Sequence, residues 1–243
     1  NKMKEHNDLV LELPGFVPED LCKQIIDEFE NAPDSEKRDG AVDYSGKIFV
    51  DKELKNSIDA SIGNMADKNI GDCKAIQEKI IKYLRHAVTL YTKCLIDEYP
   101  GRKHPEKIQK MHTFEPMIEG MRINGVGMFG LDGMQRQPKD ALYKWHYDSQ
   151  PPKSFVFGIL YLNTLKPGEG GCTTFINGRQ IRPEAGKIMI SPASWTYAHS
   201  ATEIKGEYKY ILPFHIYHGK YPGDDKKYYW WDLSNVDGLF SQF

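Results

Sequence analysis

The chain has 243 residues, with 32 Lys and Arg against 34 Asp and Glu, which gives a formal net charge of −2. Apolar residues make up 40% and charged residues 27%, a composition that argues against a disordered chain. No apolar run approaches the ~18 residues that a transmembrane helix needs, and the balanced charge gives no electrostatic footprint for nucleic acid or an anionic membrane.

The start of the chain and its cysteines indicate a location. Residues 1–8 are polar and do not form a secretory signal. The four cysteines lie far apart without a Cys-x-x-Cys pair, so neither a disulfide scaffold nor a zinc site is expected. We therefore expect a cytoplasmic protein, either a monomer or a homodimer.

The first hundred residues predict helices beside short strands. Residues 9–13 form a short strand, and Pro18 followed by two acidic residues begins an amphipathic helix over 18–31. Residues 34–46 are polar and typical of a loop, followed by a strand at 47–50. A longer apolar stripe runs from Ile76 to Leu95 at helical spacing and predicts a second helix that packs on a sheet.

The rest of the chain indicates β-structure. Residues 101–141 lose clear periodicity, and we expect strands joined by a mobile loop that serves as a lid or as a flexible connection. From residue 142 onward, apolar runs alternate with Gly, Pro or Asn, as in an antiparallel sandwich or barrel. The aromatic run Tyr228–Trp231 suggests a packed edge strand or a partner contact. The four clearest strands are predicted at 155–162, 173–176, 187–191 and 208–217.

One segment could bind a metal. In Trp145-His146-Tyr147-Asp148, the histidine and the carboxylate lie two residues apart, so on a strand both point to one face. His199 follows in a second β-segment. Two histidines and one carboxylate, brought together by a β-sandwich, form the facial triad of non-haem Fe(II) oxygenases.

A lysine lies in the following strand. Lys209 has aromatic and aliphatic neighbours, and a buried lysine needs an anionic partner. A co-substrate that chelates the metal at one end could place its far carboxylate on this ammonium. Tyr143 and Thr173 could add hydroxyl hydrogen bonds to the same carboxylate, and Arg182 is the alternative cation.

Several motifs in order then resemble a known family. The chain is similar to the prolyl 4-hydroxylase group of Fe(II)/2-oxoglutarate dioxygenases over residues 142–217. The resemblance is carried by Tyr143-x-x-His146-x-Asp148, Tyr161-Leu162-Asn163, Gly170-Gly171-x-Thr173-x-Phe175, Pro183-x-x-Gly186, His199 and Lys209.

The resemblance implies a fold and an arrangement of the chain. The implied fold is an all-β core with supporting helices: a double-stranded β-helix (jelly roll, cupin-like) with N-terminal helices packed on its major sheet. We expect a single domain over 1–243. Its parts would be helical support (1–100), strands and a mobile loop (101–141), the catalytic β-core (142–217) and a C-terminal tail (218–243).

The resemblance also implies an activity. His146, Asp148 and His199 would bind Fe(II), Lys209 would bind 2-oxoglutarate, and O₂ would drive hydroxylation with succinate and CO₂ as co-products. The expected substrate is a prolyl residue in a peptide or protein, and the resemblance suggests ascorbate as a reductant. Two alternatives stay open: an oxygenase for a free amino acid, small metabolite or nucleobase, and a cupin-like metal-binding module without oxygenase activity.

Other residues depart from the family pattern or compete for a role. Pro213, in the strand of Lys209, predicts an edge strand or a bulge there. His215 and His218 are expected to be surface or packing residues. Tyr147 and Trp195 are expected to pack the wall of the sandwich.

Overall fold

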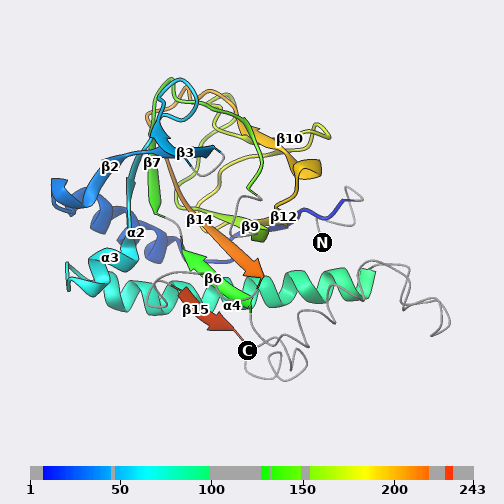
Figure 1. Cartoon of the computed structure of the whole chain (residues 1–243), viewed down its shortest axis with the longest axis horizontal. Coiled ribbons are helices and arrows are strands. Elements are labelled where there is room, and N and C mark those ends of the chain that lie inside the picture. Colours follow the sequence, from blue (N-terminus) through cyan, green and yellow to red (C-terminus); the bar gives the residue numbers. More distant parts are fainter. Residues whose placement is uncertain are drawn as a thin grey trace.

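Helices cover one side of a large sheet in the computed structural model, which describes residues 8–44, 47–98, 127–131, 133–148, 154–218 and 228–231. Figure 1 shows the longest helix running beneath the strands. No helix in this described part is long and apolar enough to cross a membrane. The helices are α2 (Glu19–Asn31), α3 (Ile62–Asp67) and α4 (Cys73–Glu98).

Local sequence signals explain where the helices begin. Pro18 precedes α2, and Glu19 and Asp20 lie in its first turn, where carboxylates interact favourably with the helix dipole. The side chain of Ser61 accepts a hydrogen bond from the backbone N–H of Asn64, which caps α3. The helices expected at 18–31 and after Ile76 are both present.

Among the described residues, the larger sheet has nine strands, and β14 lies at its centre. Its order is β1-β12-β9-β14-β7-β5-β2, and β6 pairs with both β14 and β15. The strands are β1 (Leu11–Leu13), β2 (Lys37–Asp39), β5 (Ile58–Ala60), β6 (Gly127–Leu131), β7 (Met134–Pro138), β9 (Ser154–Tyr161), β12 (Ile188–Pro192), β14 (Tyr208–His218) and β15 (Tyr228–Trp231).

A smaller sheet and a hairpin complete the described strands. The smaller sheet has the order β11-β10-β13-β8, and the hairpin consists of β3 and β4 alone. Their bounds are β3 (Ala41–Tyr44), β4 (Lys47–Val50), β8 (Tyr143–His146), β10 (Thr173–Phe175), β11 (Gln180–Ile181) and β13 (His199–Ala201).

The larger sheet is buried on both faces. Leu160 and Leu212 belong to the core formed with α2 and α4, whereas Ile159 and Tyr161 belong to a second core shared with Phe175 of the smaller sheet. This alternation follows from the two-residue period of a strand. The supporting helices pack on the larger sheet, as predicted, and the fold is a mostly antiparallel jelly roll.

The structure corrects two expectations about strands. The polar segment 34–46 is more than a loop, because it contains β2 and β3, and β3 pairs with the predicted strand at 47–50. For Pro213 the edge is wrong, because β14 is central, but the alternative of a bulge fits, because the pairing register of β14 shifts by one residue there. Pro213 falls where the neighbour of β14 changes from β7, paired up to Ile211, to β6, paired from Phe214. A residue without a backbone N–H fits this gap in the ladder.

Some expectations lie outside what is described. Most of the expected loop, residues 101–126, lies outside the described residues, and so do the side chains of Tyr228–Trp231. The backbone of that aromatic run forms β15, which pairs with β6. All four cysteines are free thiols, and Cys22 and Cys73 are buried.

Candidate metal centre and co-substrate pocket

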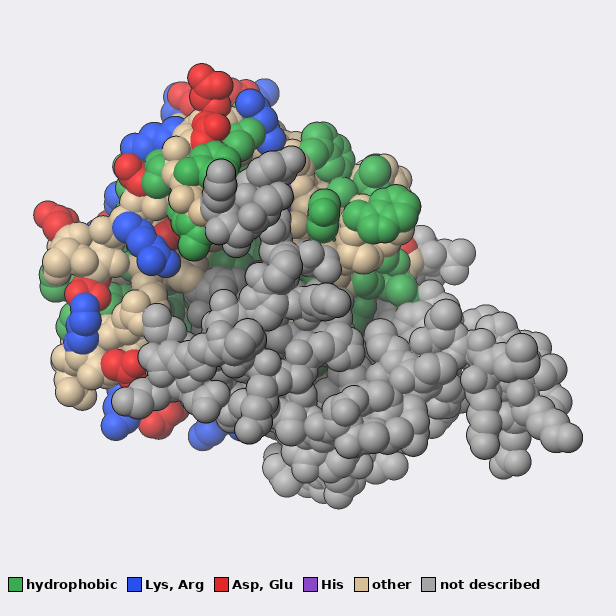
Figure 2. Space-filling view, in the orientation of Figure 1, with side chains coloured by type: hydrophobic (Ala, Val, Ile, Leu, Met, Phe, Trp, Pro, Cys, Tyr) green, Lys and Arg blue, Asp and Glu red, His purple; other side chains and the backbone are tan. Residues whose placement is uncertain are grey.

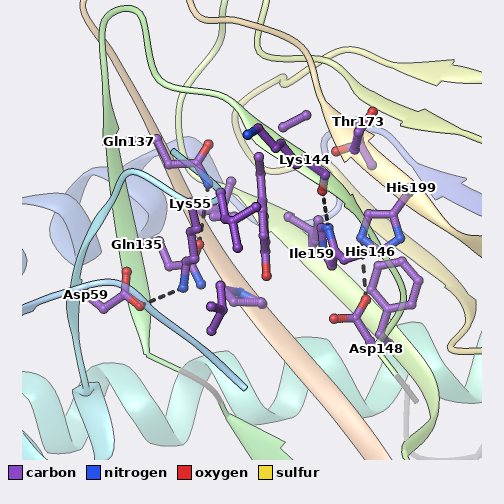
Figure 3. Close-up of a pocket in the computed structure, with 18 of the residues that line it drawn as sticks. Lys55, Asp59, Gln135, Gln137, Lys144, His146, Asp148, Ile159, Thr173 and His199 are labelled. Atoms are coloured by element: carbon purple, nitrogen blue, oxygen red, sulfur yellow. Dashed lines mark hydrogen bonds and ion pairs between the residues drawn. The ribbon is translucent and has the colours of Figure 1, made fainter. Parts of the chain in front are cut away.

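A cavity of about 640 Å³ opens between the larger sheet, the smaller sheet and the β3–β4 hairpin. His146, Asp148 and His199 line it, and so do Thr173 and Lys209. The cavity therefore collects residues from both sheets, and Figure 3 shows the first three beside one another.

Strand pairing brings the two histidines together. His146 on β8 and His199 on β13 are directly paired across the smaller sheet, so their side chains point to one face. Their ring centroids are 4.3 Å apart. Asp148, two residues after His146, completes a group whose potential ligand atoms all lie within 4.8 Å of one another.

Backbone carbonyls orient both imidazoles. Nδ1 of His146 lies 2.8 Å from the carbonyl oxygen of Lys144, and Nδ1 of His199 lies 3.2 Å from that of Tyr197. A carbonyl only accepts hydrogen bonds, so each Nδ1 carries the proton and each Nε2 keeps its lone pair. This is the tautomer that a metal-binding histidine needs.

The carboxylate of Asp148 provides the test of whether a cation fits. Within the described part of the chain, its Oδ2 is buried without a hydrogen-bond partner, although Nε2 of His199 lies only 3.4 Å away. Two lone-pair-bearing atoms that face each other in a buried site need a positive charge between them. The donor set of two imidazoles and one carboxylate suits Fe(II).

Burial and charge set the protonation of this group. Burial lowers the pKa of His199 to about 4, with a further contribution from neighbouring His146. Burial also lowers the pKa of His146. Burial alone would raise the pKa of the Asp148 carboxyl, but the neighbouring His199 and His146 outweigh it and lower that pKa. At neutral pH the group thus consists of neutral imidazoles and a carboxylate, the forms that bind metals.

Lys209 lies on the larger sheet in the same cavity. The residue is 1% exposed, and within the described part of the chain it forms no ion pair with a carboxylate. Burial lowers the pKa of its ammonium to about 8. Lys209 is therefore a mostly protonated cation at neutral pH without an anion, as expected for a residue that awaits an anionic ligand.

Two further residues surround this lysine, and neither was singled out for a role in the sequence. The buried hydroxyl of Tyr161 lies 2.7 Å from Oγ1 of Thr173, and the Lys209 ammonium lies 5.7 Å from the Tyr161 ring. Gln137 is buried and pairs directly with Lys209 across β7 and β14. The family motif containing Tyr161 was a signal for it, whereas nothing local indicated Gln137.

Tyr143 contacts the metal-binding group. Its ring stacks on His146 with a centroid distance of 3.7 Å, and the Lys55 ammonium lies 5.9 Å from the same ring. Burial raises the pKa of the phenol, with a further contribution from Asp148, so it stays protonated. Its expected contact with a co-substrate carboxylate stays a prediction.

Several competing residues lie elsewhere or behave differently. Arg182 pairs with Glu184 at the surface, so it is not a rival to Lys209. His215 lines the cavity with its ring centroid 6.5 Å from that of Phe157, which agrees with a packing role, and the side chain of His218 lies outside the described residues.

Two aromatic side chains expected to be packed are exposed. Trp195 is 70% exposed and Tyr147 is 47% exposed, so the expectation that they pack the wall was wrong. In Figure 2, hydrophobic side chains gather at the upper right, over the end of the molecule where Figure 1 labels β10.

Solved structures resemble this chain over most of its length. A prolyl 4-hydroxylase from Pseudomonas putida is 15% identical, with a TM-score of 0.56 over 87% of this chain and 93% of the other. A Trichoplax adhaerens prolyl hydroxylase in complex with a hypoxia inducible factor peptide fragment is 14% identical, with a TM-score of 0.57 over 88% and 85%. The chain has a prolyl 4-hydroxylase-like fold.

A third structure with this prolyl 4-hydroxylase-like fold carries a co-substrate. It is the viral collagen prolyl hydroxylase of Paramecium Bursaria Chlorella virus-1 in a 2OG complex, which is 15% identical with a TM-score of 0.50 over 88% of this chain and 97% of the other. No protein-family model and no curated protein matches this sequence. At these identities the likeness concerns the fold.

Proposed function

We propose that the protein is an Fe(II)/2-oxoglutarate-dependent dioxygenase of the prolyl 4-hydroxylase type. The observation that carries this proposal is the buried Asp148 oxygen, which has no hydrogen-bond partner among the described residues although Nε2 of His199 lies 3.4 Å away. Lys209, a cation that forms no ion pair with the residues the structure describes, lines the same cavity. Together these groups match a metal and an anionic chelating ligand.

The proposed iron ligands lie at one end of the cavity, and the proposed 2-oxoglutarate-binding residues lie at the other. His146, Asp148 and His199 would hold Fe(II), and Lys209 would bind the far carboxylate of 2-oxoglutarate, with Thr173 at the same end. When bound there, iron and 2-oxoglutarate supply the oxidising chemistry that converts O₂ and a C–H bond to a hydroxyl group, with succinate and CO₂ as co-products. The protein orients both ligands and excludes water.

The proposed substrate is a prolyl residue in a peptide or protein. Support comes from the fold, since one similar structure holds a hypoxia inducible factor peptide fragment and another is a 2OG complex. Tyr143 lines the cavity beside His146, where a phenol could orient a substrate group. Ascorbate as reductant and a cytoplasmic location belong to the same proposal.

An anaerobic titration tests the function. Protein loaded with Fe(II) is titrated with 2-oxoglutarate, and the visible charge-transfer band of the chelate is followed. We expect the band in the wild-type protein. We expect His199→Ala to bind iron at least about 100-fold more weakly, because one of the three proposed metal ligands is lost.

The outcomes separate the alternatives. A band that Lys209→Ala weakens supports the oxygenase. Iron binding without any band would make the protein a metal-binding module, and wild-type iron affinity in His199→Ala would refute the proposed ligands.

A further inference from the structure

A second buried lysine lines the cavity, and it is paired. Nζ of Lys55 lies 2.9 Å from Oδ2 of Asp59, with the two side chains only 7% and 10% exposed. The hydroxyl of Ser57 donates to Oδ1 of the same carboxylate at 2.7 Å. Figure 3 shows this pair on the opposite side of the pocket from the metal-binding group. A buried ion pair is costly to desolvate and is weak evidence for a purely stabilising role.

The pair is separate from the Lys209 end of the cavity. Asp59 pairs with Gln135, which in turn pairs with Ile211, so these residues form one row across β5, β7 and β14. Lys209 lies two residues from Ile211 on the same face. Two strand spacings of ~4.8 Å put Asp59 roughly 10 Å from β14, which leaves room for two different ligands.

Tyr143 connects the pair to the metal-binding group. Its ring faces the Lys55 ammonium at 5.9 Å and stacks on His146 at 3.7 Å. The backbone supports the same arrangement, because Lys55 and Tyr143 form a β-bridge and the N–H of Lys144 donates to the carbonyl of Leu54. A group bound at Lys55 would thus be held one aromatic ring away from His146.

The side of the pair near Gly40 is closed. A Cβ added to Gly40 would lie 2.1 Å from Oγ of Ser57 and 3.1 Å from Cε of Lys55. Nζ of Lys55 also reaches the carbonyl oxygen of Ala41, at 3.5 Å. The hairpin backbone therefore packs directly on the pair, and the cavity is the side on which Lys55 and Asp59 line open space.

The remaining hydrogen-bonding capacity defines a ligand. An ammonium has three N–H donors and a carboxylate about four acceptor sites. Asp59 and Ala41 use two of the donors of Lys55, while Lys55 and Ser57 use two of the acceptor sites of Asp59. Within the described residues, the pair thus offers one donor beside a free acceptor site, with no net charge.

We propose that Lys55 and Asp59 bind two consecutive amide groups of the substrate backbone, with the C=O of one accepting from Lys55 and the N–H of the next donating to Asp59. This inference rests on the proposed function and specifies its substrate as amide-bearing, hence peptidic. A free amino acid is disfavoured because its two charged groups would lose their hydration to a pair that carries no net charge. An anion is better served by Lys209, which has no counter-charge.

Matched small ligands test the proposal. N-acetylproline methylamide and N-acetylalanine methylamide carry the complete amide, whereas the corresponding methyl esters lack the N–H. Binding to anaerobic Fe(II)- and 2-oxoglutarate-loaded protein is measured by ligand-observed NMR. In the wild-type protein, we expect the better-binding amide to have about tenfold higher affinity than its ester, because the ester lacks one hydrogen bond to a charged group.

A double variant identifies the residues responsible. Lys55→Met/Asp59→Leu replaces the ion pair by apolar groups of similar size, a change that buried pairs generally tolerate. We expect the amide to bind about tenfold more weakly and the amide–ester difference to vanish, while the melting temperature and the 2-oxoglutarate titration midpoint stay as in the wild type. Lys68→Met/Glu36→Leu, which removes an ion pair of 2.6 Å that does not line the cavity, should keep the wild-type preference.

Each contrary result has its own meaning. If the amide still binds more tightly than the ester in the double variant, Lys55 and Asp59 do not bind the substrate amides. If the wild-type protein binds free L-proline and neither amide, the proposal is also wrong. Absence of the 2-oxoglutarate band in the wild-type protein refutes the proposed function itself, and the inference with it.

Discussion

Two lysines line one cavity, and they differ in their partners. Lys209 is 1% exposed without an ion pair among the described residues, whereas Lys55 lies 2.9 Å from Asp59. The same side chain therefore serves two purposes: a buried ammonium without a counter-charge is a receptor for an anion, and a neutralised one can bind only a neutral polar group. The partners of a buried lysine, more than its residue type, therefore define the ligand that its subsite can bind.

The largest expected effect is on stability. Lys55→Met leaves the Asp59 carboxylate buried without its cation, so we expect the free energy of unfolding to fall by about 3–5 kcal/mol. Denaturant unfolding measures this change. A loss below about 1 kcal/mol would mean that Asp59 is already neutral or solvated, and the contrast between the two lysines would disappear.

The same substitution at the other lysine should act in the opposite direction. Lys209→Met removes a buried charge that nothing neutralises, so the ligand-free protein should melt at or above the wild-type temperature. The 2-oxoglutarate dissociation constant should rise about 10- to 100-fold, as for a lost hydrogen bond to a charged group. Thermal melts and the anaerobic titration check both; a lower melting temperature with unchanged affinity would make Lys209 structural.

The pH dependence follows from the lowered pKa of Lys209. With a pKa of about 8 in the folded protein and an ordinary value near 10.4 when unfolded, the unfolded chain binds more protons between these values. The contribution of Lys209 to the unfolding free energy thus increases with pH across that window. Binding of 2-oxoglutarate needs the ammonium, so its dissociation constant should rise above about pH 8, up to tenfold per unit. Lys209→Met should abolish this dependence.

The smallest effect is expected beside Lys209. Tyr161→Phe removes the hydroxyl that contacts Thr173 but keeps the ring near the ammonium. Loss of one neutral hydrogen bond is worth about 1 kcal/mol, so the 2-oxoglutarate dissociation constant should rise about fivefold. An unchanged constant in the anaerobic titration would leave Thr173 oriented by other means.

How much the sequence could predict depended on whether residues share a segment. His146 and Asp148 are two apart on a strand, so local periodicity alone put them on one face. Pairing of His146 with His199 needed the fold, which the family resemblance supplied.

Other features had no local signal. Lys55 and Asp59 are four residues apart, a spacing that resembles an ordinary surface pair, and only the packing of Gly40 and the β5–β7 pairing bury them in the cavity. Gln137 could not be predicted either, because strand register, which the local sequence does not reveal, places it opposite Lys209. The strand at 37–39 is polar throughout, and its pairing with β5, not its propensity, makes it a strand.

The pairing of His146 with His199 also bears on how the chain folds. These residues are distant in the sequence, and β8, which carries His146, pairs only with β13 among the named described strands. Contacts of such high sequence separation are slow to form, because the intervening chain must be ordered first. A metal bound by both imidazoles would join β8 to β13 only in the native state, and would therefore stabilise the native state by mass action. Unfolding in a chelator should therefore be faster than in excess metal, and refolding should limit the rate at which the newly made protein acquires its ion.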